Sequence, residues 1–304
     1  MRRGIAAAAA ALCLLAAGTV VQASTLRFCD RPADLSAAEQ DRILRFGAIV
    51  KTHLEQSGHR LALVSRSGLD LGRFGVRYTH AGVSLQASRE APWAVRQLYY
   101  ACAEQRPRIF DQGMAGFLLG LDNPRQGFIS AVLLPPEAEA ELERVVLDDR
   151  QALQLLGAGY SANAHAFSVS YQNCNQWLAE MLAAAWNSDA SDGREPRAAA
   201  QAWLGSAGYR PTTFEVTLPP PRWLGSIFPL LHHDDHPADD LDRNLMRVSM
   251  PASIEDFVRR RLPQASRVEF CFDADQVVIH HGWQPLGEGC RPGPGDSVVN
   301  LAAQ

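Results

Sequence analysis

Lysine is almost missing from this chain, because Lys51 is the only lysine among 304 residues. Arginine supplies the other positive charges, acidic residues outnumber Lys and Arg by 33 to 29, and the formal net charge is −4. A protein that binds nucleic acid presents a basic patch or stripe, and no segment of this sequence is strongly basic. The composition therefore argues against nucleic acid as a partner.

Long hydrophobic runs are also missing after the first residues. The N-terminal segment "MRRGIAAAAAALCLLAAGTVVQAS" has two arginines, a short apolar run and a small-residue cleavage site ending at Ala23. This is the three-part pattern of a secretory signal peptide, and its apolar run is too short and alanine-rich for a permanent membrane span. We expect residues 1–23 to be removed and the mature protein, without a transmembrane span, to be periplasmic or secreted.

Cysteine is scarce and its number after signal removal is odd. The mature chain keeps five cysteines: Cys29, Cys102, Cys174, Cys271 and Cys290. Disulfides persist in an oxidising compartment, and an odd number leaves at least one thiol unpaired. Cys271 and Cys290 flank a predicted hairpin and form a natural local pair. Cys29 and Cys102 could form a second pair, which would leave Cys174 free, although the sequence alone leaves other pairings open.

The periodicity along the chain predicts an α+β fold. Ser36 and Glu39 form a capping box at the start of an amphipathic pattern, and strand and helix patterns alternate after it. We expect a core domain over 24–187, a polar linker over 188–196 and a C-terminal extension over 197–304 that packs on the core. The predicted helices are 36–57, 137–157, 174–186 and 252–262. The predicted strands are 60–68 with a turn after it, 74–85, 92–102, 127–136, 164–171 and a hairpin over 267–282.

The segment "YQNCNQWLAEM" places Cys174 at the first turn of a predicted helix. The unpaired N–H groups and the helix dipole at this position favour a thiolate, which is the nucleophilic form of cysteine. Amide donors from Gln172, Asn173 and Asn175 could bind the oxyanion of a tetrahedral intermediate or the substrate. A buried structural thiol and a disulfide partner are the two alternatives.

A nucleophilic thiol needs a base, and His80 is the candidate among nine histidines. It lies in "YTHAGVSL", in the middle of a predicted strand, where Ala81 and Gly82 allow close approach. We expect its imidazole to face the sulfur of Cys174. A third polar group should orient the ring; Gln97 on the adjoining strand is the candidate, with Glu104 in reserve.

The spacing of these residues supports a resemblance to known families. T-H-x-G-hydrophobic on a strand, followed about 90 residues later by N-C-x-x-aromatic at a helix start, resembles the circularly permuted papain-like fold of NlpC-type peptidases and lecithin:retinol acyltransferase-like enzymes. The resemblance implies a permuted papain-like core, an antiparallel sheet packed on helices, with Cys174 as nucleophile, His80 as base and Gln97 near the third position. The mature chain also resembles an exported bacterial family known as domain of unknown function 2145.

A second cluster of titratable residues lies in "LLHHDDHPADD", residues 230–240. His232, His233 and His236 stand beside four aspartates, a density that could bind zinc or another divalent cation. Pro237 prevents a continuous helix that would align His232 with His236. We therefore expect a solvated turn here and assign no metal or other cofactor.

Three functions follow as hypotheses. The first is an exported cysteine hydrolase or acyltransferase acting on an amide or ester, with a cell-wall peptide favoured over a lipid acyl chain. The second is a non-catalytic periplasmic binding module that uses the same groove between strand and helix. The third is a metal-binding envelope protein centred on the histidine and aspartate loop at 232–240.

Overall fold

The structure is a computed structural model that describes residues 35–187, 195–216, 230–273 and 275–301. The predicted signal peptide and Cys29 lie outside the described residues, and so does most of the predicted linker. Both stay predictions. The description below concerns the four described ranges.

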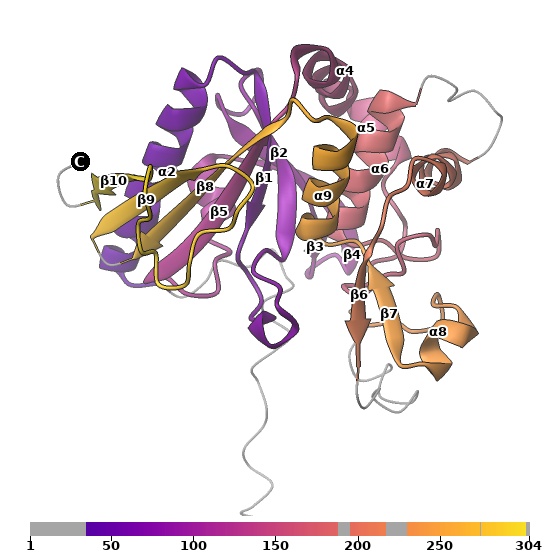
Figure 1. The fold of residues 1–304 in the computed structure, drawn as a ribbon. Coiled ribbons are helices and arrows are strands. Elements are labelled where there is room, and N and C mark those ends of the chain that lie inside the picture. Colours follow the sequence, from indigo (N-terminus) through magenta and orange to yellow (C-terminus); the bar gives the residue numbers. More distant parts are fainter. Residues whose placement is uncertain (1–34, 188–194, 217–229, 274, 302–304) are drawn as a thin grey trace, which may run out of the picture.

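One antiparallel sheet of eight strands forms the centre of the molecule (Figure 1). Neighbouring strands follow the order β10-β9-β8-β5-β1-β2-β3-β4. The strands are β1 (Leu61–Arg66), β2 (His80–Leu85), β3 (Ala94–Ala101), β4 (Arg106–Gln112), β5 (Gln126–Leu133), β8 (Ser266–Asp273), β9 (Gln276–His281) and β10 (Ser297–Asn300). Together with the helices, this sheet confirms the α+β class.

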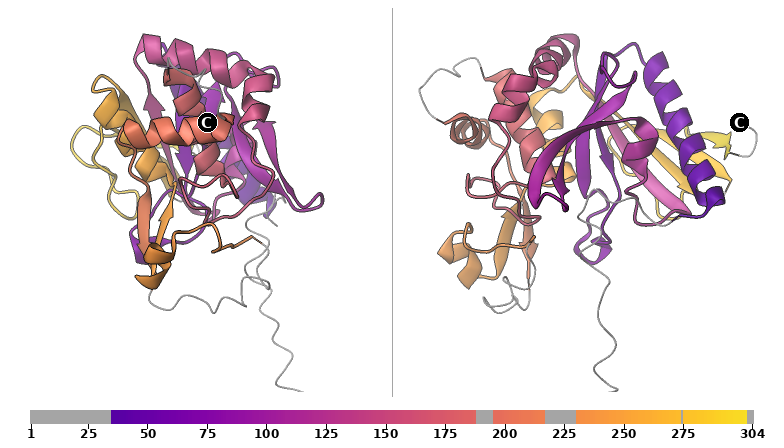
Figure 2. Two further views of the ribbon diagram at one scale, coloured as in Figure 1. Left: turned by 90° about the vertical axis from the view of Figure 1, so that its right-hand side faces the viewer. Right: turned by 180° about the vertical axis from the view of Figure 1, so that it is seen from behind.

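Helices cover both faces of this sheet (Figures 1 and 2). One face carries α2 (Ala37–Gln56) and α3 (Met114–Leu118). The other carries α4 (Pro136–Leu147), α5 (Asp149–Gln154), α6 (Cys174–Trp186), α7 (Pro196–Ser206) and α9 (Pro251–Arg261). A small sheet of β6 (Thr212–Glu215) and β7 (Leu245–Val248), with α8 (Ala238–Asp242) beside it, lies below the α6 side (Figure 1).

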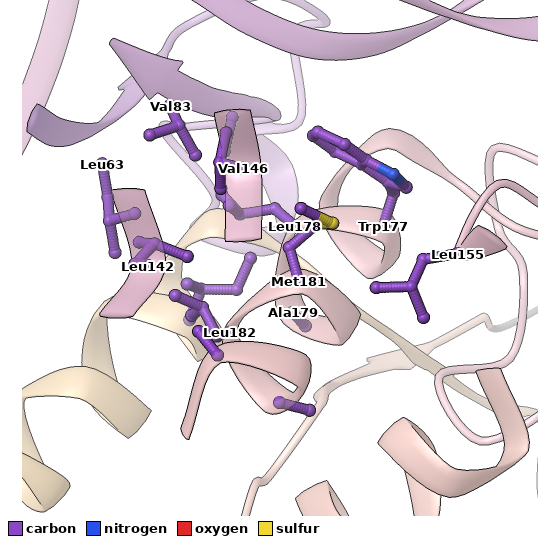
Figure 3. Packing of buried hydrophobic residues seen from close by; sticks show 14 of the residues in the cluster. Leu63, Val83, Leu142, Val146, Leu155, Trp177, Leu178, Ala179, Met181 and Leu182 are labelled. Atoms are coloured by element: carbon purple, nitrogen blue, oxygen red, sulfur yellow. The ribbon is translucent and has the colours of Figure 1, made fainter. Parts of the chain in front are cut away.

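The alternation of β1 explains why a nearly continuous apolar run forms a central strand. Leu61 and Leu63 pack in the core on the α6 side, whereas Ala62 and Val64 pack in the core under α2. A strand buried on both faces needs apolar residues at every position. Figure 3 shows the first of these cores, where Leu63 and Val83 of the sheet meet side chains of α4 and α6.

Local sequence signals located several elements correctly. Ser36 and Glu39 make the predicted capping box at the start of α2. The predicted helix at 252–262 is α9, and the predicted hairpin at 267–282 is β8 and β9. These elements have their stop and start signals within a few residues of their own ends.

Three predicted elements were wrong in part or in whole. The helix expected over 137–157 is interrupted at Asp148, whose side chain accepts the backbone N–H groups of Arg150 and Gln151 and starts α5. The strand expected at 74–85 begins only at His80, after the 3₁₀ turn Gly72–Phe74. His80 is therefore the first residue of its strand, not a central one.

The strand expected at 164–171 is a loop of turns with an isolated bridge from His165 to Val248. Its backbone groups are bound by distant segments: His165 donates its N–H to Asp235, and Ala166 donates to the carbonyl of Arg247. These partners replace a strand ladder. Alternating side chains alone could not reveal them.

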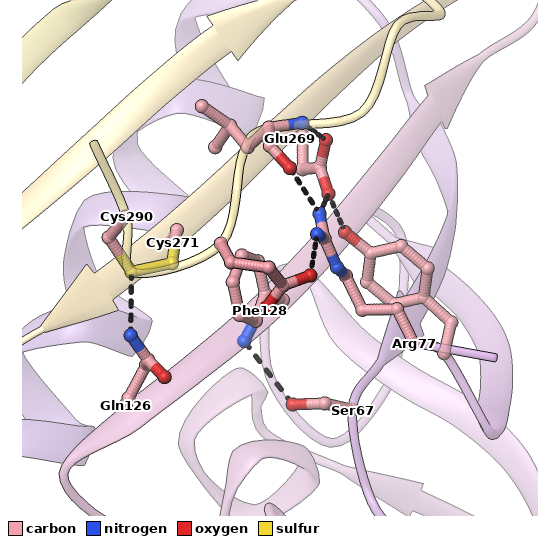
Figure 4. The surroundings of a disulfide bond; sticks show 10 residues. Ser67, Arg77, Gln126, Phe128, Glu269, Cys271 and Cys290 are labelled. Atoms are coloured by element: carbon pink, nitrogen blue, oxygen red, sulfur yellow. Dashed lines mark hydrogen bonds and ion pairs between the residues drawn. A yellow bond between two sulfur atoms is a disulfide. The ribbon is translucent and has the colours of Figure 1, made fainter. Parts of the chain in front are cut away.

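The C-terminal segment completes the main sheet. β8 pairs antiparallel with all eight residues of β5, and β9 and β10 extend the sheet beyond it. The predicted disulfide between Cys271 and Cys290 is present, with 5.4 Å between the two Cα atoms, and fastens the loop after β9 to β8 (Figure 4). Cys102 is also disulfide-bonded, and Cys174 is free, as expected.

Candidate active site

The α6 helix starts at Cys174 and presents its first turn to the beginning of β2. Asn173 is the N-cap residue, and its side-chain oxygen accepts the backbone N–H of Gln176 at 2.7 Å. The side-chain amide of Asn175 donates to the carbonyl of Thr79 at 3.1 Å. These bonds hold the thiol beside the residue that precedes His80. Cys174 is 7% exposed.

The thiol has a polar backbone environment inside an apolar core. The backbone amides of Asn175, Cys174 and Ala81 act to lower the pKa of the thiol and so favour its thiolate form. Burial has the opposite and larger effect and raises the pKa of Cys174 to about 11, although the positive charge of Arg66 also acts to lower it. Cys174 is therefore a thiol, not a thiolate, at neutral pH.

His80 is oriented by the glutamine that the sequence indicated. Its Nε2 lies 2.6 Å from Oε1 of Gln97, and Nε2 of Gln97 donates to Oε1 of Gln112 at 2.7 Å. Because the amide nitrogen of Gln97 is already a donor, its oxygen accepts the Nε2–H of His80. This tautomer leaves the lone pair on Nδ1 of His80.

The imidazole of His80 is held in its neutral form. Its ring packs against Tyr99, with 4.6 Å between centroids, and against Phe117 of α3 at 5.8 Å. Burial lowers the pKa of His80 to about 3, and the charge of Arg66 lowers it further, while the hydrogen bond with Gln97 opposes the shift. The imidazole has a free Nδ1 lone pair, but with this low pKa it is a weak proton acceptor while it stays buried.

The expected direct contact between imidazole and sulfur is absent from the described residues. Ala81 packs in the core on the α6 side with Cys174, so the alternation of β2 turns His80 toward the face that carries α3. No hydrogen bond joins the His80 ring to the sulfur within the described ranges. The two groups lie at the same end of β2, and the charge of Arg66 acts on both of them.

Two of the three amides expected to face a substrate are instead bound within the protein. Gln172 accepts the N–H of Gly157 at 2.8 Å and donates to the carbonyl of Leu155 and to Glu180. Asn173 caps α6 and also lies within 3.4 Å of the carbonyls of two neighbouring loops. Both therefore position the loop and helix around Cys174, which corrects their predicted role.

Asn175 is engaged through one end of its amide only. Its nitrogen bonds Thr79, whereas its Oδ1 is buried without a hydrogen-bond partner among the described residues. The side-chain nitrogen of Asn175 has two N–H groups, which point to the carbonyl of Thr79 and to the sulfur of Met250 at 4.0 Å, so the side chain offers no free donor to an oxyanion in this conformation. The backbone N–H groups of Asn175, Cys174 and Ala81 are the donors that act on the sulfur.

Glu104, the reserve candidate for the third residue, is not part of this site. It is exposed on the turn after β3, where it pairs with Arg106 and Arg108. The hydrogen bond from His80 selects Gln97 in its place.

The histidine and aspartate loop uses its rings for packing and hydrogen bonds. His232 stacks on Tyr171 with 4.1 Å between centroids, and His236 bonds the carbonyl of Asn163 at 2.8 Å through Nε2. His233 lies 3.5 Å from the side-chain nitrogen of Asn163. Within the described parts of the chain, no three His, Cys, Asp or Glu side chains are grouped as a metal site.

The sequence reading overlooked Arg66. It ends the apolar strand β1 and lies directly across from His80 in the β1–β2 register. Its side chain is 4% exposed, although arginine is rarely buried without a charged partner. A charged residue in "LALVSRSG", at the end of a run that is otherwise buried, was the available signal.

Comparison with known proteins identifies the chain at the level of its family. No helix among the described residues has the length and apolar character needed to cross a bilayer. The chain has no significant match among curated proteins or among solved structures. A family model described as an uncharacterized protein conserved in bacteria, domain of unknown function 2145, matches residues 53–258, a segment that contains His80, Gln97 and Cys174. The chain belongs to this bacterial family.

Proposed function

We propose that this protein is an exported cysteine hydrolase or acyltransferase in which Cys174 is the nucleophile and His80 the base. One observation carries the proposal. A free thiol at the start of α6 is held against backbone N–H groups, and one of these, from Ala81, belongs to the residue next to a Gln97-oriented imidazole. Nucleophile, base and orienting group are the parts that covalent acyl transfer requires.

The reaction assigns one step to each part. The sulfur of Cys174 attacks the carbonyl carbon of an amide or ester while its proton passes to Nδ1 of His80. The oxyanion of the tetrahedral intermediate is stabilised by the backbone N–H groups at the start of α6. His80 then protonates the leaving amine or alcohol, and a thioester remains on Cys174. Water or another acceptor, deprotonated by His80, releases the acyl group and restores the thiol.

The resting state sets a condition on this mechanism. With the pKa of Cys174 at about 11 and that of His80 at about 3, both groups are neutral near pH 7. Proton transfer therefore accompanies attack on the substrate instead of preceding it. The His80 imidazole must also move from the α3 face of β2 to within hydrogen-bond reach of the sulfur on the α6 face, so the mechanism requires a rearrangement at the start of β2 when substrate binds.

The substrate class is proposed from the resemblance and from the expected export of the chain. NlpC-type peptidases cleave cell-wall peptides, and the T-H-x-G and N-C-x-x-aromatic patterns of this chain resemble theirs. A peptide amide of the cell wall is therefore the first candidate, and the acyl ester of a lipid is the second. The permuted papain-like arrangement of the core is part of the same proposal.

The test is to trap the acyl group on Cys174. The purified protein is mixed with p-nitrophenyl acetate and, separately, with cell-wall peptide fragments, and the intact mass is followed with time. We expect a thioester adduct on the wild-type protein, none on Cys174→Ala, and formation on His80→Ala slower by about 100-fold. An adduct that forms equally fast in His80→Ala would contradict the role of the base.

A non-catalytic binding module is the second candidate, and one observation favours it. Cys174 and His80 are each less than a tenth exposed, and no hydrogen bond joins them within the described residues. If cell-wall fragments bind with equal affinity to the wild-type protein and to Cys174→Ala, and no adduct or product appears, this second function replaces the first.

A further inference from the structure

Arg66 is fixed in place by main-chain and aromatic groups. Its Nη1 donates to the carbonyls of Ser67, at 3.1 Å, and Gly120, and its Nη2 donates to the hydroxyl of Tyr99. The guanidinium also lies over the ring of Phe117, 5.4 Å from its centroid. All these partners are uncharged, and they leave the guanidinium in one position.

Gly68 and Gly120 have no side chains, and the guanidinium of Arg66 occupies the space that a side chain at either position would fill. A Cβ added at Gly68 would lie 2.9 Å from Nη1 of Arg66, and one added at Gly120 would overlap Nη2. Neither glycine has a positive φ, so their backbone conformation is open to other residues. Their common feature is contact with Arg66.

Arg66 has no carboxylate partner among the described residues. The other three buried arginines do: Arg96 is paired with Asp111 at 2.6 Å, Arg197 with Glu180 at 2.9 Å and Arg267 with Glu269 at 3.1 Å. Nε of Arg66 is buried and makes no hydrogen bond within the described ranges. An unpaired buried charge destabilises a fold, so its presence here calls for a compensating role.

We propose that Arg66 is the fixed cation of the Cys174–His80 site, which holds His80 in its neutral form and favours loss of the proton from the sulfur of Cys174. The geometry places it for this role. Arg66 stands opposite His80 in the β1–β2 register, and its guanidinium and the His80 ring both contact Tyr99 and Phe117. Cys174 packs in the same core as Ala81, the next residue of β2. Arg66 acts through these two residues and is a positioning residue.

The electrostatic sign follows from the groups that surround the site. Arg66 on β1, Tyr99 on β3 and Tyr160 in the loop before α6 are the titratable groups that act on His80 or Cys174, and Gln97, Gln112 and Phe117 are uncharged. Burial raises the pKa of Tyr160 well above its usual value, so its hydroxyl is neutral near pH 7. A positive charge in low dielectric disfavours the imidazolium and favours the thiolate.

The first experiment removes the charge and keeps an unbranched side chain. In Arg66→Met, we expect the rate of Cys174 alkylation by iodoacetamide at about pH 8.5 to fall at least about tenfold, which corresponds to a rise of about one unit in the thiol pKa. The pKa of His80, followed by NMR of the imidazole, should rise by a similar amount. Arg66→Lys keeps the charge and should restore most of both values.

A matched control and a second variant separate charge from folding. Arg260→Met removes the same charge from an exposed pair with Asp256 on α9, and should leave the alkylation rate unchanged. Gly120→Ala keeps Arg66 but displaces its guanidinium, and should lower the rate in the same direction as Arg66→Met. It serves as the test if Arg66→Met does not fold.

The outcomes separate this inference from the proposed function on which it rests. Folded Arg66→Met and Gly120→Ala proteins with wild-type alkylation rates and an unchanged His80 titration would overturn the role of Arg66, even if the protein forms an acyl adduct. If both variants shift the two titrations and no acyl adduct forms with either substrate, the fixed cation stands and the hydrolase or acyltransferase proposal fails.

Discussion

Two buried arginines on opposite faces of the sheet show different uses of the same side chain. On the α6 side, Arg197 is paired with Glu180 and also donates to the carbonyls of Ser168, Val169 and Tyr171. On the α3 side, the guanidinium of Arg66 has neutral partners only within the described residues. Burial is similar, at 4% exposed for each.

The difference lies in what the charge acts on. The charge of Arg197 is matched by Glu180, which is 0% exposed and also accepts from Gln172 and Gln201. That network fixes the loop that leads into Cys174. The charge of Arg66 is unmatched and acts on His80 and Cys174. A buried cation with a carboxylate partner organises structure, whereas one without such a partner is available to shift the titration of its neighbours.

The largest expected effect is the loss of the paired arginine. Arg197→Met leaves Glu180 buried without its ion pair, which costs about 3–5 kcal/mol of unfolding free energy. Urea denaturation followed by circular dichroism measures the change. The double variant Arg197→Met with Glu180→Gln should recover part of the loss. A single variant as stable as the wild type would show that Glu180 does not depend on this partner.

The next effect is a pH dependence of stability that comes from His80, on the face of the sheet that carries Arg66. His80 has a folded pKa of about 3 and an ordinary unfolded pKa near 6.5, so the unfolded state binds the proton first as pH falls. Stability from His80 is complete above about pH 6.5 and is lost progressively toward pH 3. Between pH 7 and pH 4, the unfolding free energy of His80→Gln should therefore fall by about 3 kcal/mol less than that of the wild type. Parallel stability curves for the two proteins would contradict this.

A smaller effect is expected from removal of the unpaired arginine. Arg66→Met loses three hydrogen bonds but leaves no carboxylate unpaired, and it removes a buried charge. We expect a change of about 1 kcal/mol in unfolding free energy, well below that of Arg197→Met. The same urea denaturation compares the two variants. Equal losses of unfolding free energy in Arg66→Met and Arg197→Met would show that the two arginines contribute to stability in the same way.

The smallest effect serves as the reference for an ion pair in solvent. Arg260 and Asp256 pair on the exposed surface of α9 with the i,i+4 spacing of a helix. Asp256→Asn should change the unfolding free energy by about 0.3–0.5 kcal/mol, and by less in high salt. A loss above about 1 kcal/mol would show that solvent exposure does not explain why the Arg260–Asp256 pair contributes less to stability than the buried Arg197–Glu180 pair.

The sequence predicted those parts of the fold whose causes are local. Ser36 and Glu39 define the start of α2 within four residues, and the disulfide partners Cys271 and Cys290 are brought together by one hairpin. The position of Cys174 at a helix start and its free thiol were also predicted correctly. Gln97 was found because the adjoining strand places it within reach of His80.

The parts that failed depend on residues far apart in the chain. The loop before α6 alternates polar and apolar residues like a strand, but its backbone is bound by Asp235 and Arg247. Gln172 was expected to face a substrate, and its amide is bound by Gly157 and Glu180. The surroundings of Arg66 come from three separate elements. No local pattern carries that information.

The pairing of β5 with β8 limits where the chain can be truncated for expression. The segment that matches the family model ends at residue 258, before β8 begins. A fragment trimmed to that segment would leave the edge of β5 that pairs with β8 as an open row of backbone donors and acceptors, which invites intermolecular strand pairing. Such a fragment should aggregate, and a well-behaved sample requires the chain through Leu301.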